Sequence, residues 1–267
     1  MDVTEFQFVS AGCRCSGLYY LPNGWCRPTK LPTIVVVPGG MGIMSTPRGE
    51  DCGRGLPELA KSFAQDGFLA CSYNGRGQGD SEGARSGHNL AVEDLAAALT
   101  YLRDECDAAD GRRIGLFGQS VGGMAAVLTA ARDDGIKSLI LWGTLPRYSV
   151  WKQKQQLGGD GTMEVLWQRA SKEEDWKGKS IEDFVREFQT FDPIDLIGKL
   201  SQPILLAGGS EDKEYFHADE QSDFFEAANS KRVMFLKVKG EPHRIRHGSP
   251  SFPILAKLLS AWFRETL

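Results

Sequence analysis

A serine framed by glycines is the residue whose setting points most directly to chemistry. Ser120 stands in Gly118-Gln119-Ser120-Val121-Gly122. Residues 113–117 before it are an apolar run that predicts a buried strand, and residues 123–132 after it are rich in strong helix formers. A serine at such a tight turn is raised out of the sheet, with a helix N-terminus behind it to stabilise developing negative charge. The flanks therefore favour a nucleophile over an ordinary turn serine.

A serine hydroxyl is a weak nucleophile at neutral pH, so it needs a base, and the base needs an orienting carboxylate. Asp212 follows a strand predicted over 203–207, and His243 follows a strand predicted over 233–238. Open α/β sheets place their sites beyond the carboxyl ends of the strands, so we expect both residues to meet Ser120. The chain order serine, aspartate, histidine is the order expected when these partners follow successive strands of such a sheet.

Each of these two assignments has a neighbouring rival. Glu211 and Asp219 compete with Asp212 as the orienting acid. His247 competes with His243, because it lies four residues further on and could share one side of a short helix. The remaining histidines fall at predicted helix starts and are expected on the surface: His88 and His217.

The elements that must position these residues alternate along the chain. Strands are predicted over 4–9, 14–21, 33–37, 68–73, 113–117, 138–142, 203–207 and 233–238, with helices over 56–66, 90–106, 123–132, 217–229 and 252–264. This alternation predicts an α/β protein, with a mostly parallel central sheet of about eight strands and helices on both faces. Residues 146–195 break the rhythm, because they are charged and aromatic without a strand signal. We expect a core of residues 1–145 and 196–267 and a small helical cap over 146–195.

Composition limits the classes of function. The chain of 267 residues is 41% hydrophobic and 25% charged, with a net charge of −4, so a soluble protein that does not bind nucleic acid is expected. The N-terminus lacks a signal-peptide pattern and no apolar run is long enough to span a bilayer, which predicts a cytoplasmic protein without a membrane partner. The six cysteines lack zinc-ligand spacing and are expected to be reduced thiols. No metal and no organic cofactor are expected, and homo-oligomer formation is left open.

The chain resembles the α/β-hydrolase superfamily over nearly its full length. Besides the serine turn, residues 38–42 (PGGMG) resemble the family's oxyanion-hole loop, and residues 73–83 (YNGRGQGDSEG) its arginine-glycine loop after the fourth strand. Residues 192–206 resemble the approach to its acid strand. The sequence departs from the family at Pro38, where many members carry histidine, and at Asn74, which is often aspartate.

The resemblance implies a role for each residue. Ser120 is the nucleophile, His243 the general base, and Asp212 the residue that holds the imidazole tautomer. The backbone N–H of Val121 forms the oxyanion hole with that of Gly40 or Met41, which are open alternatives with Gly40 preferred. Two further residues of the arginine-glycine loop are expected to brace that loop instead of touching substrate: Arg76 and Asp80.

The activity that these roles imply is hydrolysis of a carboxylic ester of a small or medium organic molecule, through an acyl-serine intermediate. A serine peptidase, an aminopeptidase or a thioesterase would use the same residues. Because this fold also supports proteins that do not hydrolyse, an acyltransferase, a lyase or cyclase of a biosynthetic pathway, and a ligand receptor remain alternatives.

Overall fold

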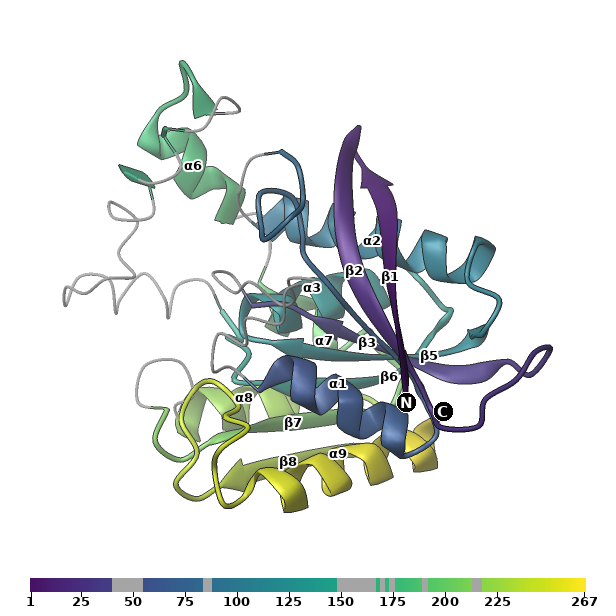
Figure 1. Cartoon of the computed structure of the whole chain (residues 1–267). Coiled ribbons are helices and arrows are strands. Elements are labelled where there is room, and N and C mark those ends of the chain that lie inside the picture. Colours follow the sequence, from purple (N-terminus) through teal and green to yellow (C-terminus); the bar gives the residue numbers. More distant parts are fainter. Residues whose placement is uncertain are drawn as a thin grey trace.

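A single eight-stranded sheet organises the chain, with strand order β1-β2-β4-β3-β5-β6-β7-β8 (Figure 1). The computed structural model describes residues 1–39, 55–83, 88–147, 167–168, 171–172, 176–188, 192–212 and 218–267. The strands are β1 (Asp2–Ser10), β2 (Cys13–Leu21), β3 (Leu31–Val37), β4 (Leu69–Tyr73), β5 (Ala109–Gln119), β6 (Ile136–Trp142), β7 (Ile204–Gly209) and β8 (Val233–Val238). The β1–β2 and β2–β4 pairs are antiparallel, and all later pairs are parallel.

Helices cover both faces of this sheet (Figure 1). They are α1 (Leu56–Gln65), α2 (His88–Asp104), α3 (Val121–Ala130), α6 (Ile181–Phe188), α7 (Pro193–Ile197), α8 (Ala218–Ala227) and α9 (Phe252–Thr266). One core lies between the sheet and α1 and α9, where Phe63 meets Phe263 edge to face with ring centroids 5.6 Å apart. The other lies under α2, α3, α7 and α8 and contains Leu99, Val127 and Phe224. The central strands are therefore buried on both faces, which is why residues such as 34–37 read as unbroken apolar runs.

The fold predicted from the sequence is confirmed, and the corrections concern where elements begin and end. Strand β5 begins at Ala109, earlier than predicted, and its ladder with β3 shifts register between Pro32 and Thr33. The five-residue helix α7 was not predicted. Helix α1 ends as expected just before Gly67, whose φ of 98° suits the turn into β4.

The segment expected to form the cap is described only in part. Its residues 181–188 form α6, which contacts α2, and Trp176 and Phe184 pack edge to face with centroids 5.0 Å apart. Both of these rings are buried, so the segment has a small aromatic core of its own. A separate cap over 146–195 stays a prediction.

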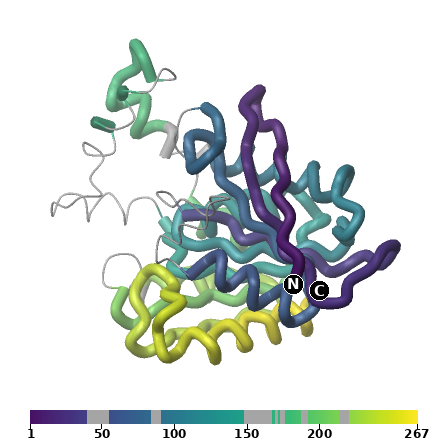
Figure 2. Tube along the Cα trace, in the orientation of Figure 1, coloured from purple at the N-terminus to yellow at the C-terminus, as the bar shows by residue number. Residues whose placement is uncertain are grey.

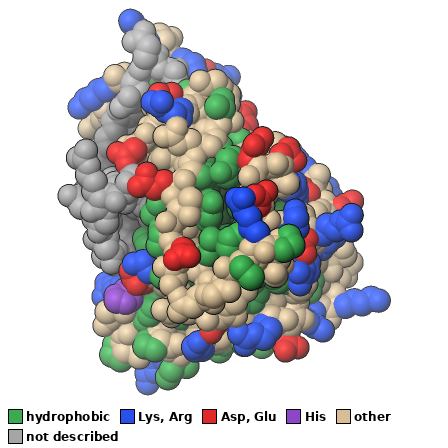
Figure 3. All heavy atoms as spheres, turned by 45° about the vertical axis from the view of Figure 1, so that its right-hand side comes forward, with side chains coloured by type: hydrophobic (Ala, Val, Ile, Leu, Met, Phe, Trp, Pro, Cys, Tyr) green, Lys and Arg blue, Asp and Glu red, His purple; other side chains and the backbone are tan. Residues whose placement is uncertain are grey.

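The surface carries charges of both signs. Figure 3 shows acidic and basic side chains interspersed over one face, without a field of a single sign. None of the helices in the described residues is long and apolar enough to cross a membrane. The two ends of the chain lie together in Figure 2, and Met1 and Arg264 line the same hollow.

Candidate active site

Ser120 sits at a strained turn between β5 and α3. It is the N-cap of α3, with φ 56° and ψ −120°, a backbone conformation that residues other than glycine rarely adopt. Its backbone N–H donates to the carbonyl of Trp142 on the neighbouring strand, with N···O 2.9 Å. Such backbone strain typically costs about 1–3 kcal/mol and persists where the surrounding structure imposes it, often at functional sites.

The glycines around Ser120 are required by close packing. A Cβ at Gly118 would lie 2.5 Å from the Cα of Gly123, and a Cβ at Gly122 would lie 2.4 Å from the carbonyl oxygens of Val37 and Pro38. Both distances are far below van der Waals contact, and the atoms met are backbone atoms that cannot turn aside. The serine turn therefore lies directly against the end of β3, and only glycine fits at positions 118 and 122.

Asp212 and His243 are hydrogen-bonded to each other across neighbouring loops. The acid loop (residues 209–212) begins at the last residue of β7, and the base loop (residues 239–243) follows β8. The Nδ1 of His243 lies 2.6 Å from Oδ2 of Asp212, whose side chain is 1% exposed against 19% for the imidazole. With an ionised carboxylate, Nδ1 is the protonated nitrogen, which leaves Nε2 as the acceptor that a general base needs.

The end of β6 joins the nucleophile to the base. Trp142 accepts the Ser120 N–H at its carbonyl and donates its indole Nε1–H to the carbonyl of His243, with N···O 2.9 Å in each case. Gly143 follows with φ 55°, and a Cβ there would lie 3.0 Å from Nδ1 of His243 and 3.4 Å from Oδ2 of Asp212. Sequence reasoning missed both residues. The available signal was a tryptophan and a glycine ending the strand next to the serine strand.

The expected oxyanion hole is described on one side. Val121 is the first residue of α3, so its N–H has no acceptor inside the helix. Gly40 and Met41 lie outside the described residues. Gly39, just before them, lies against the serine turn, where an added Cβ would be 3.1 Å from the carbonyl oxygen of Gln119 and 3.5 Å from Cβ of Ser120.

The rival acids and bases are placed elsewhere or are not described. Glu211 is exposed, whereas Asp212 beside it is buried against the imidazole. His247 points to Glu58, with Nε2 to Oε2 3.9 Å, and packs on Phe252. The other rivals have side chains outside the described residues: His88, His217 and Asp219.

The arginine-glycine loop is anchored beneath the surface. Arg76 is 9% exposed, and its Nε donates to Oδ1 of Asp94 at 2.7 Å, while its guanidinium also donates to Glu93 at 2.6 Å. Asp94 further accepts the Arg76 backbone N–H and the hydroxyl of Ser10. The network ties the loop after β4 to α2 and β1, so Arg76 braces the fold, while Asp80 lies exposed.

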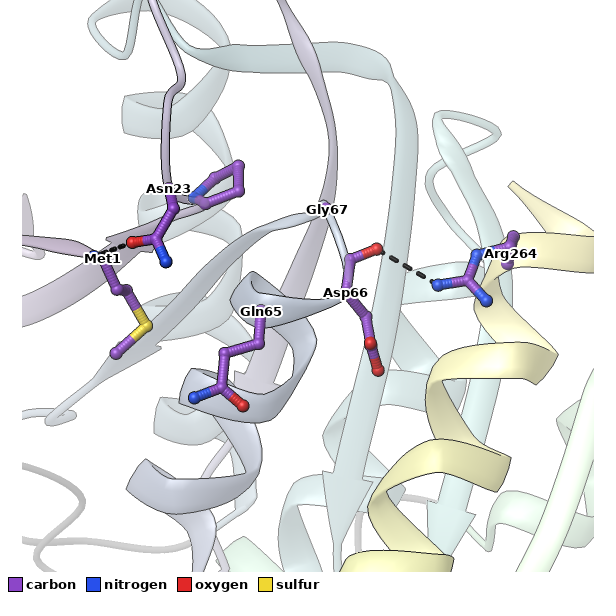
Figure 4. Close-up of a pocket in the computed structure, with 7 residues that line it drawn as sticks. Met1, Asn23, Gln65, Asp66, Gly67 and Arg264 are labelled. Carbon is purple, nitrogen blue, oxygen red and sulfur yellow. Dashed lines mark hydrogen bonds between the residues drawn. The ribbon is translucent and has the colours of Figure 1, made fainter.

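A separate hollow of about 420 Å³ lies at the opposite end of the sheet, where β4 and its parallel neighbours begin (Figure 4). In it Arg264 donates to the carbonyl of Asp66, and the amino group of Met1 donates to Asn23. No predicted site residue lines this hollow. Across the described residues, no group of three or more histidine, cysteine, aspartate or glutamate side chains could hold a metal ion.

Comparison with known proteins agrees with this fold. Residues 43–172 match the family model described as serine aminopeptidase, S33. The chain is similar in fold to DcsB, solved in complex with its substrate analogue, at 20% identity over 100% of both chains with a TM-score of 0.76. It is also similar to the Butyrivibrio proteoclasticus protein Est1E, solved with ferulic acid, at 18% identity over 98% of each chain and a TM-score of 0.74. The chain therefore has an α/β-hydrolase fold.

Curated relatives match a smaller share of the chain at higher identity. An uncharacterised 31.7 kDa protein of Escherichia coli is 31% identical over 114 residues, which are 42% of this chain and 36% of that protein. The proline iminopeptidase of Clostridium botulinum is 28% identical over 227 residues, 82% of this chain and 72% of that enzyme. The chain thus matches about a third of the length of the first of these relatives. A peptidase occurs among the curated relatives, and an esterase of Pyrococcus furiosus occurs among the solved structures of similar fold, at 14% identity over 99% of this chain and a TM-score of 0.72.

Proposed function

We propose that this protein is a serine hydrolase that cleaves a carboxylic ester of a small or medium organic molecule. The observation that carries the proposal is the buried Asp212 carboxylate on Nδ1 of His243, tethered through Trp142 to the strained turn of Ser120. A turn serine with no chemical role would need neither the backbone strain nor an oriented imidazole linked to it through Trp142.

In this mechanism the Oγ of Ser120 attacks the ester carbonyl carbon while Nε2 of His243 takes its proton. The tetrahedral oxyanion is held by the N–H of Val121 and by Gly40 or Met41, and one such donor typically contributes about 3 kcal/mol to transition-state stabilisation. His243 then protonates the departing alcohol, which leaves an acyl-serine. A water deprotonated by the same imidazole adds to the acyl carbon, and the carboxylic acid leaves as the Ser120 hydroxyl is restored.

The buried carboxylate has two tasks in this sequence. It keeps the proton on Nδ1, so that Nε2 faces the serine as an acceptor, and it stabilises the imidazolium that forms during attack. The 1% exposure of the Asp212 side chain keeps this charge away from water, which strengthens both effects.

A peptidase is the second candidate. The match to the serine aminopeptidase model and the similarity to the Clostridium botulinum proline iminopeptidase support it, because an amide is opened by the same machinery. We propose that residues 146–195 cap the site and select between the two classes of substrate.

The test is labelling with a fluorophosphonate probe, followed by peptide mass spectrometry. We expect the label on Ser120, its loss in Ser120→Ala, and turnover in a panel of nitrophenyl esters, thioesters and aminoacyl anilides. Faster cleavage of the anilides than of the esters would favour the peptidase. Absence of label on a folded protein would refute the hydrolase proposal.

A further inference from the structure

A buried carboxylate lies beside the base without an evident task. Glu241 is 2% exposed and belongs to the base loop, two residues before His243. One oxygen, Oε1, accepts the hydroxyl of Ser251, whereas Oε2 has no hydrogen-bond partner among the described residues. Burying a charged group with an unsatisfied oxygen is costly, so a glutamate at this position calls for a compensating role.

The backbone around Glu241 joins the base loop to the acid loop. The carbonyl of Glu241 accepts the N–H of Glu211 at 2.9 Å, and the N–H of Gly240 donates to Oγ of Ser210 at 2.9 Å. The loops approach so closely that a Cβ at Gly209 would lie 1.9 Å from the carbonyl oxygen of Glu241. A displacement of Glu241 is therefore transmitted to both loops that carry the aspartate–histidine pair.

The side chain of Glu241 anchors these loops to α9. Ser251, its partner, is the N-cap of this helix, and its hydroxyl also lies 3.1 Å from that of Ser249. The first N–H groups of a helix and its dipole favour negative charge at this end. Helix α9 is itself fixed in the core through buried residues such as Leu255 and Leu259. The carboxylate thus links the base loop to a helix that is packed in the core.

We propose that Glu241 is a positioning residue that holds His243 on Asp212. The inference rests on the proposed function for its effect on catalysis, but not for its effect on the hydrogen bond between the two side chains. Removing the charge or its partner lets the base loop rotate away from α9, which lengthens the Nδ1···Oδ2 hydrogen bond and lowers kcat while substrate binding is kept.

The experiment uses four variants of the full chain. Glu241→Gln keeps the shape without the charge, Glu241→Ala removes the group, and Ser251→Ala removes the partner of Oε1. The matched control is Ser138→Ala, because Ser138 bonds Thr266 at the far end of α9, with Oγ to Oγ1 2.7 Å, and touches neither loop. The readouts are kcat and KM on the best substrate and the downfield proton resonance of the His243 imidazole Nδ1–H.

We expect the resonance to move upfield or broaden in the three variants around Glu241 and to stay in place in Ser138→Ala. The kcat of Glu241→Ala should fall by about tenfold or more with KM within twofold, as misplaced catalytic groups do. Unchanged resonances in folded Glu241→Gln and Ser251→Ala would overturn the proposal, even where Glu241→Ala fails to fold. The resonance can be observed without turnover, so the two proposals can fail separately. If the hydrolase proposal is wrong, the wild-type protein will still show the resonance, but the fluorophosphonate probe will not label Ser120.

Discussion

A methyl group placed at Gly143 should disable the site without dismantling the fold. In Gly143→Ala the new Cβ would lie 3.0 Å from Nδ1 and 3.1 Å from Cε1 of His243. Non-bonded carbon contacts are optimal at roughly 3.5–4.0 Å, so the imidazole must move by about half an ångström. The φ of 55° adds backbone strain of about 1–3 kcal/mol.

That displacement acts on the hydrogen bond that orients the base. A misplacement of about 1 Å can cost roughly a hundredfold in rate, so we expect kcat/KM to fall by about 10- to 100-fold, with slower fluorophosphonate labelling. The control is Gly24→Ala, which places alanine at a φ of 76° with no atom within 4 Å of the new Cβ. Both variants carry the backbone strain of a positive φ, and only Gly143→Ala should lose activity. Equal activity of the two variants would refute the reasoning.

Three other perturbations have expected outcomes. Trp142→Phe keeps an aromatic ring but removes the N–H that donates to the base loop. A lost hydrogen bond of about 1 kcal/mol should lower kcat by about three- to tenfold at constant KM in steady-state assays. An unchanged kcat would argue against a role for this hydrogen bond. Asp94→Ala leaves Arg76 without its buried partner, which should lower the free energy of unfolding by about 3 kcal/mol. Calorimetry should show Tm lower by roughly 6–12 °C. A shift of Tm under about 2 °C would contradict a bracing role. Burial raises the pKa of the Cys15 thiol from 9.0 to about 12, so at pH 8 its thiolate fraction should be about a thousandfold below that of a thiol whose pKa is 9.0. In native protein, iodoacetamide should therefore alkylate buried Cys15 far more slowly than exposed Cys26, as followed by peptide mass spectrometry. Equal rates in native protein, not only in denaturant, would show the burial to be wrong.

Much of the fold could be predicted because local pattern and tertiary position agree. Runs such as residues 34–37 are apolar throughout since β3 is buried on both faces, and Gly67 follows α1 where the backbone needs a positive φ. Helix α7 was not predicted because a helix of five residues is too short to show a hydrophobic periodicity. The register shift in β5 depends on its neighbour β3, which lies far away in sequence.

The residues of the candidate site also differ in how far the sequence could predict them. Ser120 could be found because the close approach of β3 forces a glycine pattern into a few consecutive residues. Asp212 and His243 could be placed on loops, but their hydrogen bond depends on how β7 and β8 lie together. Trp142 left only a weak local signal, a tryptophan followed by a glycine at the end of β6, since its role lies in contacts to two distant segments.

The position of β8 in the sheet has a consequence for how the protein inactivates. Strand β5, which leads to the serine, lies between two strands, whereas β8, which leads to His243, has one neighbour, and Met234 and Phe235 on it are 52% and 40% exposed. Fraying of an edge strand costs far less free energy than global unfolding. On warming, we therefore expect the imidazole to leave its carboxylate before the serine turn unfolds. Activity should then disappear at a lower temperature than the secondary structure.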